Sequence, residues 1–111
     1  LDQSLIAGIG NIYSDEILFE AGVLPTRLAG ELSQQEAARL YRSIPKILNL
    51  ALRYGGTSSS DYRQLDGSRG AFLSLAKVYG RAGRPCKVCS KIIERVKVAG
   101  RSSHYCPTCQ R

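Results

Sequence analysis

The stretch CKVCSKIIERVKVAGRSSHYCPTC, residues 86–109, contains all four cysteines of this 111-residue chain. Cys86 and Cys89 form one Cys-x-x-Cys pair, Cys106 and Cys109 form another, and sixteen residues separate the pairs. A two-residue gap lets one tight turn present both sulfurs to the same side, and the longer gap suffices for a hairpin that brings the turns together. This spacing is typical of a tetrahedral zinc site. The four cysteines are therefore predicted to bind one zinc ion.

The predicted zinc ion is structural, because four thiolates complete its coordination and leave no position for a catalytic water. His104, the single histidine, is not needed as a ligand and is interpreted as a strand or surface residue. Two disulfides in a small secreted domain are the alternative. Zinc is favoured over them because the sequence shows no apolar signal segment and no run long enough to cross a membrane.

Positive charge is concentrated in the part of the chain that contains the cysteines. The formal net charge is +7 and the isoelectric point is about 9.5. Residues 76–111 contain nine Lys or Arg and one Glu, whereas residues 1–75 contain seven basic and eight acidic residues. This asymmetry predicts an anionic partner. Nucleic acid is favoured over a membrane surface, because the basic residues do not follow an amphipathic helix.

Residues 1–54 are predicted to be helical, with a first helix over Asn11–Ala21. Apolar residues recur there at helical spacing, Gly22 is a typical helix stop, and Pro25 marks a turn. The chain opens with apolar periodicity already running and without Met. We therefore expect it to be the C-terminal part of a longer protein.

A second helix is predicted to follow Ser33-Gln34-Gln35-Glu36, a capping-box pattern in which Ser33 and Glu36 accept from each other's backbone N–H. Gly55-Gly56 ends this helix. Pro45 lies inside it and predicts a kink near Tyr41–Pro45. One face is predicted to be core and consists of Ala37, Leu40, Tyr41, Ile44, Ile47, Leu48, Ala51 and Leu52.

The rest of the chain is predicted to be a loop and a ribbon, which gives three regions: 1–56, 57–75 and 76–111. Residues 55–75 are rich in Gly and Ser and predict a long loop. Ala76–Tyr79 is predicted to be a strand. Ile92–Val98 and Ser102–Tyr105 are predicted to pair around a turn at Ala99-Gly100, which places Arg101 at the tip of a hairpin held by the metal.

Three stretches together resemble one known family. GIGNIYSDEILFEAGVLP (8–25), KVYGRAGRPCKVC (77–89) and AGRSSHYCPTCQR (99–111) are similar, in this order and spacing, to the C-terminal half of bacterial formamidopyrimidine-DNA glycosylase. The resemblance covers essentially the whole chain. It implies a mainly α helix–two-turns–helix module followed by a β-hairpin zinc ribbon, with the N-terminal catalytic domain absent from this sequence.

The resemblance also implies a function. Such enzymes are bifunctional DNA glycosylases and AP lyases that remove oxidised purines from damaged double-stranded DNA in the bacterial cytoplasm. Their catalytic N-terminal proline and neighbouring glutamate have no counterpart in this sequence, so no catalytic residue is expected here. The chain is expected to be an inactive, monomeric DNA-binding half that works with the missing N-terminal domain.

Six residues are implied as DNA contacts by the same resemblance. Asn11, Tyr79 and Arg101 would bind phosphates near the extruded nucleotide, and the lesion-capping loop would include Thr57, Ser60 and Gly70. From the residues alone, alternatives remain for the first three: a plain helix cap, a half-buried core tyrosine and an exposed turn arginine. Serine stands at position 60, where the family often has a basic residue, which leaves the lesion preference open.

Two other functions remain open. An endonuclease VIII-like glycosylase for oxidised pyrimidines is the closer one, although that group usually has a Tyr-Leu-Arg run where this chain has Ile12-Tyr13-Ser14. A non-enzymatic zinc-ribbon module that binds nucleic acid accounts for the cysteines and the charge. It does not account for the GIGNIYSDE helix start or for the order of the parts.

Overall fold

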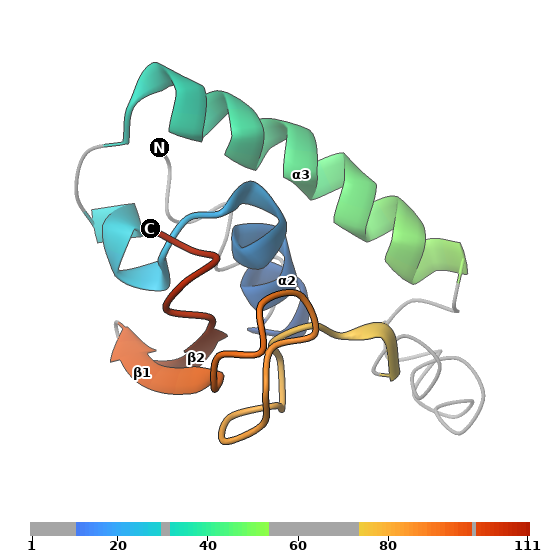
Figure 1. Cartoon of the computed structure of the whole chain (residues 1–111). Coiled ribbons are helices and arrows are strands. Elements are labelled where there is room, and N and C mark those ends of the chain that lie inside the picture. The colour runs from blue at the N-terminus through green and yellow to red at the C-terminus, as the bar shows by residue number, and fades with distance from the viewer. Residues whose placement is uncertain (1–10, 30–31, 54–73, 99) are drawn as a thin grey trace.

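The central element of the fold is helix α2, Asn11–Ala21. The structure is a computed structural model that describes residues 11–29, 32–53, 74–98 and 100–111. Helix α3 crosses one side of α2, and a β-hairpin packs against the other (Figure 1). Every residue from 12 to 19 is buried. The predicted first helix is thus confirmed with its bounds. It is buried between α3 and the hairpin.

Two apolar clusters meet at α2. The first joins α2 to α3 and consists of Ile12, Tyr13, Ile17, Leu18, Ala21, Val23, Leu40, Ile47 and Ala51. The second joins α2 to the ribbon and consists of Phe19, Val78, Cys86, Ile93 and Cys106. Because both clusters contain residues of α2, this helix positions α3 on one side and the ribbon on the other.

Helix α2 ends at the predicted stop residue in a Schellman motif. Gly22 has φ +74°, a conformation that costs glycine little. Its N–H donates to Phe19 O at 3.1 Å, and Val23 N–H donates to Leu18 O at 3.0 Å. The chain then continues into a short 3-10 helix, η1, Pro25–Ala29.

Helix α3, Gln34–Arg53, begins with the predicted capping box. Glu36 N–H donates to Ser33 Oγ at 3.1 Å, and Ser33 N–H donates to Glu36 Oε1 at 2.9 Å. The helix continues past Pro45. Gly55-Gly56, predicted to end it, lie outside the described residues.

The predicted core face of α3 is too wide. Leu40, Ile47 and Ala51 are buried, but Tyr41 is 51% exposed and Leu52 is 72% exposed. Successive residues turn by about 100° around a helix axis, so Tyr41 and Leu52 lie beyond the edge of the face that meets α2. Ser43, which the prediction omitted, is buried on the other edge and donates its Oγ–H to Arg39 O at 2.7 Å.

The capping box makes the stability of α3 pH-dependent. Arg27 donates to both Glu36 oxygens, at 2.8 and 2.9 Å. These hydrogen bonds, with that from the Ser33 backbone, lower the pKa of Glu36 from 4.5 to about 2. A lowered pKa stabilises the fold above the unfolded-state pKa, and the contribution is lost as pH falls toward 2.

We expect the difference in unfolding free energy between the natural chain and Glu36→Gln to be largest above pH 5 and to shrink as pH falls below about 4.5. Thermal unfolding followed by helical circular dichroism at several pH values measures it. A difference that stays constant over this range would remove Glu36 as the titrating group.

The hairpin is formed by β1, Glu94–Val98, and β2, Arg101–Tyr105. The strands are antiparallel, with Val98 opposite Arg101 and Arg95 opposite His104. Gly100 has φ +84° at the turn between them. The predicted hairpin and its tip are confirmed, with β1 starting two residues later than expected; Ile92 instead forms an isolated bridge with Pro85.

The predicted strand at Ala76–Tyr79 is wrong. Among the described residues this segment has no strand partner and is a bend followed by a turn. Its backbone N–H groups donate to a side chain of α2, which takes the place of a neighbouring strand.

Among the described helices, none has the length and the apolar composition that a membrane-spanning segment requires.

Candidate functional site

The four cysteine sulfurs converge on one point. Their Sγ atoms all lie within 4.8 Å of one another, with Cys89 to Cys106 at 3.4 Å and Cys86 to Cys109 at 3.9 Å. Zinc–sulfur bonds of about 2.3 Å in a tetrahedron place the sulfurs about 3.8 Å apart. A disulfide requires about 2.05 Å. The donor set and the spacing therefore fit one structural zinc ion and do not fit two disulfides.

The two cysteine turns are built alike. Ser90 N–H donates to Cys86 O at 2.9 Å, and Gln110 N–H donates to Cys106 O at 3.1 Å. In each turn a backbone N–H also points at the first sulfur: Val88 N–H at Cys86 Sγ, 3.4 Å, and Cys109 N–H at Cys106 Sγ, 3.3 Å. Such N–H groups stabilise the thiolate form that binds metal.

The thiol of Cys86 is biased toward its charged form. Burial raises its pKa, but hydrogen bonds from the backbone N–H groups of Cys89 and Val88 and from the Cys106 and Cys89 side chains together outweigh this and lower the pKa to about 7. Because this thiol ionises near neutral pH, protons compete less strongly with a metal ion for its sulfur.

Gln110 ties the second cysteine turn to the helical module. Its side chain is buried; Oε1 accepts from Cys106 N–H at 2.8 Å, and Nε2 donates to Val23 O at 2.8 Å. Beside it, Arg111 N–H donates to Gly22 O at 2.9 Å. The metal turn is therefore fixed to the residues that follow α2.

Asp15 of α2 holds strand β2. It is fully buried, and its Oδ2 lies 2.9 Å from His104 N, which donates to it, and 3.0 Å from His104 Nδ1. Burial raises the pKa of Asp15, and the hydrogen bonds and charge of His104 and the charge of Arg101 oppose the rise. His104 is a strand residue, as predicted, but its contact with Asp15 gives it a role that the sequence did not indicate.

Glu16, the next residue, holds the segment before the zinc turns. Its buried carboxylate accepts three consecutive backbone N–H groups: Lys77 at 2.8 Å, Val78 at 3.0 Å and Tyr79 at 2.9 Å. Asp15 and Glu16 were missed as site residues. The available signal was three consecutive polar residues, 14–16, that interrupt the apolar run from Ile12 to Phe19, because buried polar groups require partners.

Three of the six predicted DNA-contact residues lie in the described part of the chain. Asn11 is the first residue of α2, as expected, although its side chain is not described. Tyr79 is half-buried, with its ring 5.2 Å from that of His104 in an edge-on contact. Arg101 begins β2 at the hairpin tip. The structure thus brings Tyr79 beside β2, whereas Thr57, Ser60 and Gly70 lie outside the described residues.

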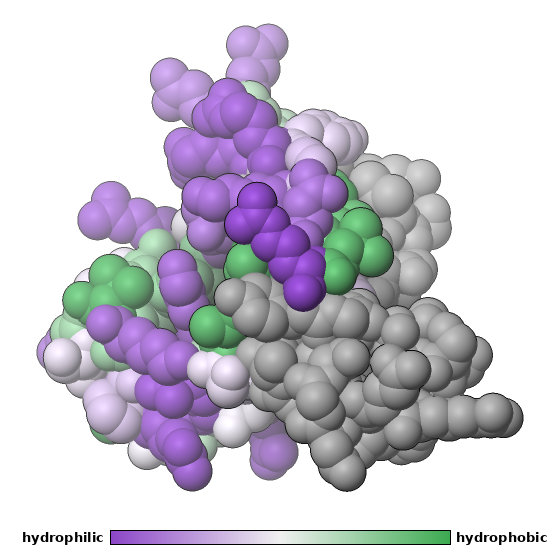
Figure 2. All heavy atoms as spheres, turned by 90° about the vertical axis from the view of Figure 1, so that its right-hand side faces the viewer, coloured by the Kyte–Doolittle hydropathy of each residue, from purple (hydrophilic) through white to green (hydrophobic). Residues whose placement is uncertain are grey.

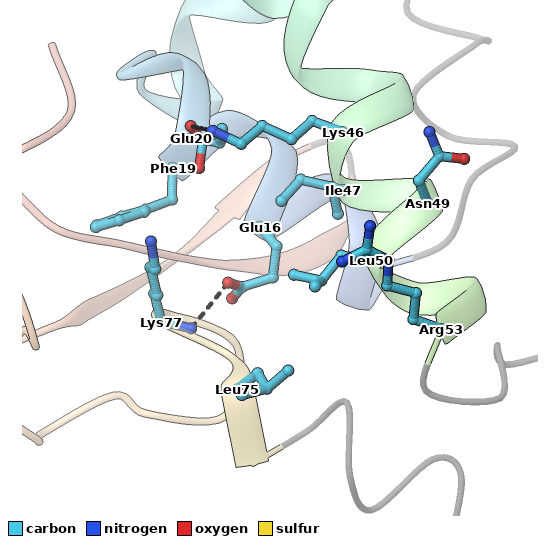
Figure 3. A pocket seen from close by; sticks show the side chains of 10 residues that line it. All are labelled: Glu16, Phe19, Glu20, Lys46, Ile47, Asn49, Leu50, Arg53, Leu75 and Lys77. Atoms are coloured by element: carbon cyan, nitrogen blue, oxygen red, sulfur yellow. Dashed lines mark hydrogen bonds and ion pairs between the residues drawn. The ribbon is translucent and has the colours of Figure 1, made fainter.

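A cavity of about 420 Å³ lies between α2, α3 and the segment before the ribbon. Glu16, Lys46 and Arg53 contribute polar groups, while Phe19, Ile47, Leu50 and Leu75 are apolar (Figure 3). Figure 2 shows the right-hand side of Figure 1, where hydrophilic side chains cover the upper part and the lower left, with apolar side chains between them. Arg53 is the last described residue before positions 54–73 and Leu75 is the second described residue after them, and both line this cavity.

Basic side chains cover the outside of the ribbon. The exposed ones are Arg84, Lys87, Lys91, Arg95, Lys97 and, at the end of the chain, Arg111. The first five lie on the turns and the hairpin between Tyr79 and Arg101 in sequence, and an exposed basic surface of this kind attracts a polyanion such as DNA.

Family models match both parts of the chain. The model described as formamidopyrimidine-DNA glycosylase H2TH domain matches residues 1–63, and that described as zinc finger found in FPG and IleRS matches residues 83–111. The first match covers more than half of the chain and the second contains the four-cysteine centre.

Similar proteins share the whole stretch. A formamidopyrimidine-DNA glycosylase of Carboxydothermus hydrogenoformans is 53% identical over 111 residues, which are 100% of this chain and 42% of that protein. The crystal structure of MutM (FPG) from Thermus thermophilus has 48% identity and a TM-score of 0.77, over 92% of this chain and 39% of that one. Lactococcus lactis Fpg bound to DNA with an abasic site has 38% identity and a TM-score of 0.77, over 92% and 36%. The chain thus spans about two fifths of the length of these relatives.

Proposed function

Because this chain belongs to the formamidopyrimidine-DNA glycosylase family, we propose that it is the duplex-DNA-binding part of a base-excision-repair glycosylase and AP lyase that removes oxidised purines. The whole enzyme acts in the bacterial cytoplasm as a monomer, and the catalytic proline and glutamate belong to its N-terminal domain. This chain alone binds DNA without cleaving it. One zinc ion keeps the ribbon folded and takes no part in the chemistry.

The observation that carries the proposal is that one helix holds two separate segments, each of which carries a residue proposed to contact DNA. Glu16 fixes the segment that ends at Tyr79, and Asp15 fixes the strand that begins at Arg101. A base inside a duplex must rotate out of the stack before an enzyme can attack it, at a cost of a few kcal/mol. Phosphate contacts held rigidly around the target offset part of this cost without reading sequence.

Binding of the zinc-loaded chain to two duplexes at one fixed salt concentration tests the proposal. One duplex carries a stable abasic-site analogue and the other is undamaged. Tighter binding to the abasic duplex supports recognition of a distorted site by this part of the enzyme. Equal binding means that this chain contacts only the phosphate backbone and does not recognise damage. No binding to either duplex contradicts the proposal.

Lesion preference is tested on the whole enzyme. We expect excision of 8-oxoguanine and formamidopyrimidine to exceed excision of oxidised pyrimidines. The pyrimidine arm is informative because one relative, the L. lactis enzyme, was solved with DNA containing an oxidised pyrimidine. Faster excision of the pyrimidine would favour an endonuclease VIII-like specificity.

Arg101→Ala is expected to weaken binding to any duplex and to reduce the slope of log K against log salt by about 0.9, because one phosphate contact releases about that many counterions. Arg42→Ala is the matched control, since Arg42 is exposed on α3, the helix on the other side of α2 from the hairpin. Binding measured at four or more salt concentrations gives both slopes. If Arg101→Ala leaves the slope unchanged, this residue does not contact phosphate.

A further inference from the structure

The buried carboxylate of Glu16 is the feature that goes furthest beyond the family match. One side chain accepts three consecutive backbone N–H groups at 2.8–3.0 Å. A carboxylate has about four acceptor positions, so these three bonds use most of its capacity. Figure 3 shows Glu16 pointing from α2 toward Lys77, and both residues line the cavity.

The segment that Glu16 holds has few other backbone partners. Within the described residues, 76–79 belong to no strand or helix, and Arg81 N–H closes the following turn on Val78 O at 3.0 Å. Tyr79 is the last residue that Glu16 binds, and its ring rests edge-on against His104. Its backbone and its ring are therefore held by the two neighbouring carboxylates of α2, directly by Glu16 and through His104 by Asp15.

A buried negative charge is unexpected in a part of the protein that attracts DNA. It opposes the phosphate backbone electrostatically, and it loses solvation on burial. A neutral acceptor would satisfy fewer of the three N–H groups, because an amide side chain offers one oxygen and would turn its own N–H groups toward the remaining donors. The three N–H groups together require the carboxylate.

We propose that Glu16 is a positioning residue that sets the backbone of Tyr79 so that its hydroxyl meets a DNA phosphate. The proposal rests on the proposed function, and it assigns Glu16 no contact with DNA. Glu16 acts only through Tyr79, so the effects of changing the two residues must overlap.

A double-mutant cycle on the zinc-loaded chain tests this proposal, with Glu16→Gln, Tyr79→Phe and the double variant bound to the abasic-analogue duplex. Each single variant is expected to bind about tenfold more weakly, the fold-change of one hydrogen bond to a charged group. The double variant is expected to lose little more than either single one, since interacting residues are not additive.

Glu20→Gln is the matched control. Glu20 lies one turn further along α2 and pairs with Lys46 at 2.9 Å on the surface, where the exposed fraction of the Lys46 side chain is 67%. Both changes remove one negative charge, which by itself strengthens DNA binding. Weaker binding of Glu16→Gln, with equal or tighter binding of Glu20→Gln, therefore identifies positioning and excludes a charge effect.

Folding is checked in the same samples by zinc content, helical circular dichroism and the NMR signals of the 77–79 amides. If Glu16→Gln loses zinc or helix content, Glu16→Asp replaces it in the cycle, because it keeps the charge and shortens the reach to the amides. Additive losses, or an unchanged affinity of Tyr79→Phe, overturn the proposal. Absence of binding by the natural chain overturns the proposed function as well, so the two failures are distinguishable.

Discussion

Cys106→Ser is expected to release the zinc ion and unfold the hairpin, with loss of most DNA affinity. Structural zinc in small fingers contributes on the order of 10–16 kcal/mol at neutral pH, and a site with three thiolates retains only part of this. Cys106 is also fully buried in the apolar cluster that joins α2 to the ribbon. Zinc content, NMR signals of residues 86–109 and DNA affinity measure the three effects, and chelation of zinc from the natural chain should reproduce them.

Val88→Ser is the control for the metal site. The Val88 side chain is 65% exposed, and the contact of this residue with Cys86 uses the backbone N–H, which the substitution keeps. This variant should retain zinc and the hairpin signals. If Cys106→Ser retains hairpin signals and affinity for DNA, the helical module binds DNA alone and the ribbon is dispensable.

Asp15→Ala is expected to destabilise the fold by about 3 kcal/mol, because it leaves two part-buried nitrogen atoms of His104 without their charged partner. For a domain of this size, that corresponds to a fall in melting temperature of about 15 °C. Thermal and urea unfolding of the zinc-loaded chain measure the change. Asp15→Asn keeps one acceptor oxygen and should cost less.

Glu94→Gln is the matched control on the hairpin. Glu94 Oε1 accepts from the Tyr105 hydroxyl at 3.0 Å in an exposed pair, so its loss should change stability by less than about 1 kcal/mol. An Asp15→Ala chain as stable as this control would show that the contact with His104 contributes nothing to docking of the hairpin.

Local signals in the sequence predicted local structure well. The bounds of α2 follow from its apolar spacing and from Gly22, and the start of α3 follows from Ser33 and Glu36, which contact each other within four residues. The cysteine cluster also follows from spacing, because two short turns and one hairpin suffice to bring the sulfurs together. In each case the partners are close in sequence or belong to one repeated motif.

Contacts between distant segments were not predictable in the same way. The Ala76–Tyr79 segment has the composition of a strand, but the acceptor for its amides is a glutamate 61–63 residues earlier. Tyr41 and Leu52 are apolar and have helical spacing, yet the width of the covered face depends on what packs against α3. Asp15, Glu16 and Gln110 have partners that only the three-dimensional arrangement reveals.

The adjacent carboxylates of α2 also have a consequence for the order of folding. The zinc turns and the hairpin are contained within residues 86–110, whereas the Glu16 and Asp15 contacts join residues 61 and 89 positions apart. Closing long loops costs chain entropy before any contact compensates for it, so long-range contacts form slowly. We therefore expect metal-induced ordering of the ribbon to be fast and its docking onto α2 to limit the folding rate, with the DNA-binding surface complete only after that last step.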